Sequence, residues 1–98
     1  MSTNQVIQEE RRGLILQLLC KVPQYTASEA VIYSHLHQMG CPTSWEVLQG
    51  EIVWLEEQGL IVADWPGGFA IAKITRKGQD CADGNTKHSG VATPLPFP

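Results

Sequence analysis

Hydrophobic positions in the middle of the chain recur first with a helical period and then in two short runs. Leu48, Ile52 and Leu55 are spaced four and three residues apart, which places them on one buried face of a helix. Thr43 and Glu46 have the spacing of a capping box, so we expect the helix to begin one residue after Thr43.

A glycine stop and two β-type runs follow this helix. Gly59 stands where a helix exit requires a residue that tolerates positive φ, and Leu60 follows as the usual apolar contact. Residues 60–65 and 69–75 are rich in β-branched and aromatic side chains, and Pro-Gly-Gly at 66–68 separates them. Proline presets one turn dihedral and glycine supplies the unusual one, so the sequence predicts a tight hairpin.

Two further helices are predicted before this unit. Residues 3–22 have a helical apolar stripe that Pro23 ends, formed by Ile7, Leu14 and Leu18 and widened by Ile15, Leu19 and Val22. A second capping box, Thr26 with Glu29, predicts a helix over 27–39 whose apolar side is formed by Ala30, Ile32, Tyr33, Leu36 and Met39. Gly40 stops it, and the short connection to the next helix predicts a helix-turn-helix.

The order of elements predicts an α+β fold, a single winged helix-turn-helix domain over residues 1–84. We expect a three-helix core, a two-stranded wing and a short last helix that opens at Thr75 and ends near Gly84. Residues 85–98 form a separate tail that we expect to be extended, because it is polar and contains Gly90, Pro94, Pro96 and Pro98.

Composition weighs against some classes of function. Seven basic and ten acidic residues give a net charge of −3, whereas a dedicated nucleic-acid binder is usually basic. No apolar run approaches the roughly 20 residues needed to span a bilayer, and the N-terminus lacks the pattern of a secretion signal. Three cysteines without close pairing fit the reduced thiols of a cytoplasmic protein.

Several segments resemble one family. Residues 54–61, WLEEQGLI, resemble the end of winged-helix recognition helices, and residues 74–84, ITRKGQDCADG, are similar to a segment of small winged-helix proteins from Mu-like phages and prophages. Residues 10–19, ERRGLILQLL, and Gly90-Val91 also fit that family, so the resemblance covers nearly the whole chain. Its members are often labelled as regulators of the metal-sensor repressor type. The resemblance implies a DNA-binding, transcriptional-regulator-like homodimer in the cytoplasm of a bacterial host.

The third helix is a poor candidate for reading bases in the major groove. Its predicted outward face carries Glu46, Gly50, Val53 and Glu57, with no arginine or lysine. The chemistry of the base edges allows three candidate DNA contacts on this helix. These are Ser44 at the helix start, Glu46 to cytosine and Gln49 to adenine. Against them, the glutamates would bring negative charge toward the phosphates, from Glu46, Glu51, Glu56 and Glu57.

Basic residues cluster away from that helix. Arg11 and Arg12 lie on the first helix, and Lys73, Arg76 and Lys77 lie where the second strand meets the last helix. If duplex DNA is bound, we expect these five residues to clamp its backbone weakly, without sequence choice. The alternative is an ordinary solvated surface.

Two apolar features are candidate protein interfaces. Val47, Gly50 and Trp54 form a second stripe on the third helix. This stripe packs under the hairpin or first helix, forms a subunit or partner interface anchored by Trp54, or contacts DNA. Trp65 and Phe69 flank the wing tip, where they either contact each other or the domain body, or dock a protein.

Catalytic, cofactor and metal sites are not predicted. His35 and His37 would point about 200° apart on a helix, and Gly40 breaks the helix before Cys41. We therefore expect that the protein is not an enzyme. Two hypotheses remain: a phage regulator-like protein that binds DNA as a dimer, and a winged helix that associates with another phage protein during assembly or packaging.

Overall fold

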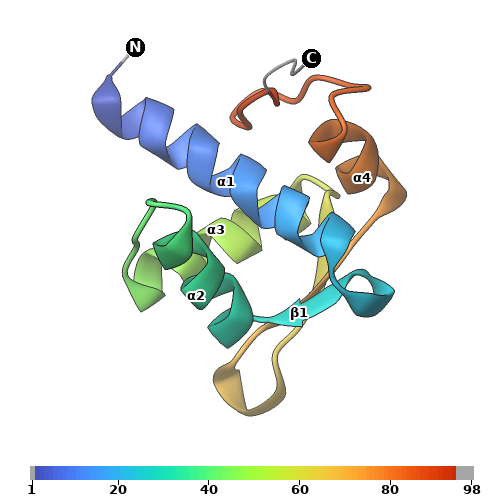
Figure 1. Ribbon diagram of the computed structural model, residues 1–98. Helices are drawn as coiled ribbons and strands as arrows, with labels where there is room; N and C mark the ends of the chain where they lie inside the picture. Colours follow the sequence, from blue (N-terminus) through green and yellow to red (C-terminus); the bar gives the residue numbers. More distant parts are fainter. Residues whose placement is uncertain (1, 95–98) are drawn as a thin grey trace.

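The computed structural model describes residues 2–94 and shows an α+β domain (Figure 1). Over these residues the chain forms four α-helices and a three-stranded antiparallel sheet. Their bounds are α1 Thr3–Lys21, β1 Thr26–Ser28, α2 Glu29–Gln38, α3 Trp45–Glu57, β2 Ile61–Asp64, β3 Ile71–Ile74 and α4 Arg76–Ala82. The predicted α+β class is confirmed, with an antiparallel hairpin directly after the third helix.

The hydrophobic core lies where α1 crosses the other helices and the inner face of the sheet (Figure 1). The predicted buried stripe of α3 is confirmed, because Leu48, Ile52 and Leu55 are fully buried. Fully buried side chains from other elements complete this core, among them Ile15, Leu16, Leu19, Ile32, Leu36 and Leu60.

The predicted end of α3 is confirmed, whereas its predicted cap is wrong. Gly59 has φ +76°, and the N–H of Leu60 donates to the C=O of Leu55 at 3.0 Å, which is the hydrogen bond of a Schellman motif. At the start, Ser44 is the cap, and its Oγ accepts from the N–H of Val47 at 3.2 Å. Thr43 precedes it with its hydroxyl buried. Two adjacent hydroxyl residues can each cap a helix, so the sequence did not separate them.

The predicted start of α2 is wrong, and the sheet has one strand more than the expected two. Thr26 lies in β1, and Ser28 caps α2 by accepting from the N–H of Val31 at 3.4 Å. The strand order is β1-β3-β2, with Ala27 of β1 opposite Ala72 of β3. An N-cap residue is extended in any case, so the three residues before the helix are free to pair with the hairpin.

The buried faces of α1 and α2 differ in part from the predicted stripes. Ile7 is 41% exposed and Met39 is 54% exposed, and Ala30 is exposed as well, whereas Leu16 was not predicted and is fully buried. The N-terminal part of α1 extends beyond the rest of the domain, so its apolar residues have no core to face (Figure 1). Farther along, α1 packs against both α2 and α4, which buries more than one stripe.

The described part of the predicted tail folds back onto α1. The N–H of Ala92 donates to the C=O of Glu9 at 3.1 Å, and Val91 is 7% exposed. The tail passes close to Gly13, where a Cβ would lie in van der Waals contact with the carbonyl oxygen of Ala92, at 3.4 Å. Residues 95–98 of the predicted tail lie outside the described residues.

The short helix α4 joins the hairpin to the core, and its position depends on one glycine. Thr75 caps α4 by accepting from the N–H of Gly78 at 3.0 Å. A Cβ at Gly78 would overlap the carbonyl oxygen of Leu60. The close approach of α4 to the corner between α3 and β2 therefore requires glycine.

We expect Gly78→Ala to lower the free energy of unfolding by about 1–3 kcal/mol, because the added methyl group has no space. Gly50→Ala is the matched control: Gly50 is an exposed helical residue with no neighbour near its Cβ direction, so this change should raise stability by about 1 kcal/mol. Urea denaturation measures both values. A Gly78→Ala variant as stable as the parent chain would contradict the packing of α4.

Candidate functional site

The outer face of α3 is acidic and apolar. The predicted outward residues are exposed, and they are Glu46, Gly50, Val53 and Glu57. Val47 lies beside them and is 43% exposed. Ser44 Oγ accepts the capping bond from the N–H of Val47, and its exposed O–H can still donate. The face that would enter a DNA groove therefore presents carboxylates and valines.

Two residues expected near that face are instead directed into the domain. Gln49 is half-buried, and its Nε2 donates to the carboxylate of Glu29 at 3.1 and 3.2 Å. Glu29 is 1% exposed and also accepts from the N–H of Ala70. Glu51 is 4% exposed, so the expectation that it brings negative charge toward a groove is wrong.

Glu51 binds the two arginines that were predicted to clamp a DNA backbone. Its carboxylate oxygens lie 3.0 Å from Nη1 of Arg11 and 3.1 Å from Nε of Arg12. Nη1 of Arg12 also donates to the C=O of Gly90 at 3.1 Å. We call Arg11, Arg12 and Glu51 the ion-pair cluster. All three side chains are largely buried, so they have little surface left for phosphate.

Trp54 packs on this ion-pair cluster and on the tail. The guanidinium carbon of Arg12 lies 3.7 Å from the Trp54 ring centroid, which is a cation–π contact. The ring of His88 meets Trp54 edge-on at 5.7 Å, and a Cβ at Gly90 would lie 2.9 Å from Trp54 Cζ2. The half-buried indole thus has partners within its own chain, on α1 and the tail, and none of these contacts involves the hairpin.

The hairpin tip remains open. Trp65 is 37% exposed and Phe69 is 58% exposed. Within residues 2–94 these two rings do not form an aromatic pair, since the ring contacts involve Tyr33, His37, Trp45, Trp54 and His88. The tip is therefore an uncharged aromatic surface that is available for contact.

The basic residues near α4 differ in how far their side chains are bound by other groups of the domain. Lys77 Nζ donates to the C=O of Gln58 at 2.9 Å, which holds it against the end of α3. The Arg76 side chain is 87% exposed, with Nε 3.7 Å from Asp80 Oδ1. Lys73 is exposed on β3. Of the five predicted backbone clamps, Lys73 and Arg76 are the ones directed to solvent.

The outer face of the sheet was not predicted as a candidate site. Val62 and Asp64 of β2 and Ile71 and Lys73 of β3 share this face, and all four are exposed. The sequence carried little signal for it, because residues 61–64 (IVAD) and 71–74 (IAKI) do not alternate between apolar and polar residues. The alternation between buried and exposed positions along both strands is visible only in the folded chain.

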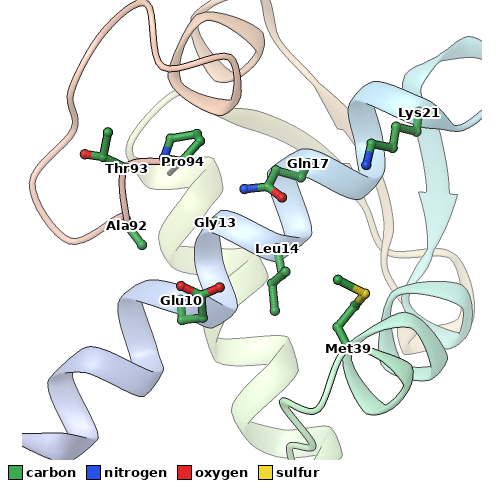
Figure 2. A pocket seen from close by; sticks show the side chains of 9 residues that line it. All are labelled: Glu10, Gly13, Leu14, Gln17, Lys21, Met39, Ala92, Thr93 and Pro94. Atoms are coloured by element: carbon green, nitrogen blue, oxygen red, sulfur yellow. The ribbon is translucent and has the colours of Figure 1, made fainter. Parts of the chain in front are cut away.

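A groove runs between α1 and residues 92–94 (Figure 2). Its volume is about 450 Å³, and its lining consists of Glu10, Gly13, Leu14, Gln17, Lys21, Met39, Ala92, Thr93 and Pro94. Figure 2 shows the three tail residues passing over α1 near Gly13. Histidine and cysteine do not line this groove, so the described residues offer no nucleophile paired with a histidine base there.

The histidines and cysteines of the described residues do not assemble. No group of three or more metal-ligating side chains is found within residues 2–94. Burial lowers the pKa of His35, and Lys21 lowers it further. Burial raises the pKa of the Cys20 thiol, with a further increase from Asp83, and burial raises that of Cys81. No helix in this part of the chain is long and apolar enough to cross a membrane.

We expect Glu51→Ala to lower the free energy of unfolding by about 3–5 kcal/mol, because it leaves two largely buried guanidinium groups without their carboxylate. Glu57→Ala on the exposed side of α3 is the control and should change stability by less than about 0.5 kcal/mol. Urea denaturation followed by circular dichroism measures both. An equally small effect of Glu51→Ala would show that the ion-pair cluster does not stabilise the domain.

Comparison with known proteins gives two relatives that match nearly end to end. An uncharacterized protein of Escherichia phage Mu, gp26, is 34% identical over 93 residues, covering 95% of this chain and 96% of the relative. An uncharacterized protein of Haemophilus influenzae is 29% identical over 97 residues, covering 98% and 94%. No protein-family model and no solved structure match the chain significantly. The chain belongs to the same family as gp26 of phage Mu.

Proposed function

We propose that this chain is a winged-helix protein of a Mu-like phage or prophage that acts by binding protein rather than by reading a DNA sequence. The order of its elements supports the winged-helix assignment, because α3 leads directly into the β2–β3 hairpin and β1 pairs with that hairpin. The observation that carries the proposal is the outer face of α3, which presents carboxylates and no cation.

The chemistry of α3 opposes base reading. Duplex DNA carries one negative charge per roughly 1.7 Å of its axis, so a helix in the groove needs cations or neutral donors. Glu46 and Glu57 would instead approach phosphates, and Gly50 offers no side chain. The amide of Gln49 is held by Glu29, so pairing with adenine would first require breaking two hydrogen bonds.

Moving the arginines of α1 into contact with DNA would cost free energy. Turning Arg12 toward a phosphate would break its bonds to Glu51 and Gly90 and its contact with Trp54. It would also leave Glu51 buried with one cation fewer. Removing a partner from a buried ion pair costs about 3–5 kcal/mol, whereas a phosphate contact at the surface returns little of that energy. We therefore propose that both arginines stabilise the fold and do not bind DNA.

Apolar side chains on the hairpin support protein association. Val62, Trp65, Phe69 and Ile71 are exposed together on one projecting element (Figure 1). Contiguous exposed apolar side chains mark interaction surfaces in soluble proteins, and aromatic residues are enriched in the centres of interfaces. The proposed setting is the cytoplasm of a bacterial host, with no catalytic role.

One observation favours a second candidate function, weak binding to duplex DNA. Lys73 and Arg76 are exposed and close in sequence, at the junction between β3 and α4. Such residues can contact the phosphate backbone without selecting a sequence. The two candidate functions differ in their dependence on salt.

A salt titration of binding to random duplex DNA tests the proposal. We expect no association even at about 50 mM salt, because α3 repels phosphate and few cations are free. Fluorescence anisotropy of a labelled duplex measures it. Binding that weakens steeply as salt rises and is lost in Lys73→Glu and Arg76→Glu, but kept in the control Lys21→Glu, would support backbone binding instead. Binding that is lost in Gln49→Ala, with the circular dichroism and the stability unchanged, would show that α3 reads DNA.

A further inference from the structure

The outer face of the sheet carries a regular arrangement of four exposed side chains. Val62 lies opposite Lys73 across the β2–β3 pair, and Asp64 lies opposite Ile71. Alternation along each strand places all four on one face, while the buried residues of these strands, among them Ile61, Ala72 and Ile74, face the core. Within the β2–β3 pair, apolar side chains therefore lie at one pair of diagonal corners and opposite charges at the other pair. Thr26 and Ser28 of β1, opposite Lys73 and Ile71, continue the same face beyond β3.

This face has no cover within residues 2–94. Val62 is 54% exposed and Ile71 is 40% exposed, so two apolar side chains of neighbouring strands face solvent. A shallow groove of about 450 Å³ runs over them, and Asp64 and Lys73 line it as well. No ion pair in this part of the chain involves either charged residue, so both remain available to a partner.

We infer that the outer face of the sheet joins two copies of this chain, with Lys73 of each copy paired to Asp64 of the other. A two-fold axis along the Val62–Ile71 diagonal places Val62 of one copy against Val62 of the other, and Ile71 against Ile71. The same rotation brings Lys73 of each copy to Asp64 of the other, so it creates two identical ion pairs. A surface that complements itself in this way is the requirement for an isologous dimer.

The backbone geometry is compatible with this contact. Neighbouring strands are about 4.8 Å apart and alternate residues about 6.7 Å apart, so the diagonal lies oblique to the strands. Rotation about it makes the strands of the two sheets cross at a steep angle, near the orthogonal class of sheet packing. Glu56 accepts from the N–H of Ala63 at 2.9 Å on the free edge of β2, which favours face-to-face contact over edge-to-edge pairing.

The charges select a second copy over nucleic acid as the occupant of this face. Lys73 alone would suit phosphate, but Asp64 lies diagonally opposite and would repel it. A standard interface takes about 800 Å² from each partner, which is about a seventh of the 5865 Å² surface of this chain. Three exposed aromatic residues lie within two positions of the ends of these strands in the sequence, and they are Tyr25, Trp65 and Phe69.

This inference rests on the proposed function, because it names the partner for the association surface. Its test is sedimentation velocity of the full chain over a range of concentrations. We expect a concentration-dependent dimer that weakens as salt rises, since ion pairs at an interface are screened. Val62→Arg should abolish it, and circular dichroism should remain unchanged because the side chain is exposed.

Charge reversal gives the sharpest version of the test. In the Lys73→Glu dimer, residue 73 of each copy would meet Asp64 of the other, so two acids repel. In the Asp64→Lys dimer, residue 64 of each copy would meet Lys73 of the other, so two bases repel. Each variant alone should therefore dimerise at least about tenfold more weakly. An equimolar mixture of the two variants should regain the dimer, because every corner then pairs opposite charges. Glu46→Lys, a reversal on the exposed face of α3, is the matched control and should leave the dimer intact.

Each other outcome overturns the inference. Single variants that still dimerise like the parent chain would move the contact to another surface. A mixture that stays monomeric would show that Lys73 and Asp64 do not pair. A parent chain that is monomeric at its highest soluble concentration would leave this face to a different protein, and the proposed function would survive if duplex DNA is still not bound. A monomer that binds duplex DNA would defeat both.

Discussion

The position of Glu51 inside the domain is the constraint on which the remaining structure depends. A buried carboxylate is tolerated only when it is paired with a cation or fully hydrogen-bonded, and Glu51 obtains two arginines from α1 across the interface with α3. The same Arg12 side chain stacks on Trp54 and binds the carbonyl of Gly90, so one guanidinium group connects α1, α3 and the tail. Charges that appear in the sequence as surface features are thereby removed from the surface.

A second buried carboxylate sets the position of the hairpin. Glu29, the first residue of α2, accepts from the backbone of Ala70, the residue before β3, and from the side chain of Gln49 on α3. The N–H of Glu29 in turn donates to the C=O of Ala70 at 2.9 Å. These bonds tie α2, α3 and the hairpin together, and the hairpin projects with its outer face and tip away from the helices (Figure 1).

These two carboxylates have opposite consequences for function. Glu51 binds the two arginines and Glu29 binds the side chain of Gln49, so these polar groups are directed away from solvent. The solvent-facing side of α3 then presents glutamates and valines. The hairpin, which is hydrogen-bonded to Glu29 through Ala70, retains the exposed apolar and aromatic side chains. Kinship with an uncharacterized protein of phage Mu places the chain in a phage family without assigning an activity. The surface chemistry therefore carries the functional argument, and it favours a protein partner.

The sequence by itself determined the elements whose signals are local. The glycine exits, the Pro-Gly-Gly turn, the buried stripe of α3 and the short last helix all follow from residue type and spacing, because caps, turns and amphipathic periodicity act within a few positions. Tertiary structure alone decided which charged residues reach solvent. Arg12 and Glu51 are 39 positions apart and Glu29 and Ala70 are 41 apart, and spacing along the chain does not encode such pairs. The pairing of β1 with β3 is equally non-local, which is why the third strand and the uncovered sheet face emerged only when the chain was folded.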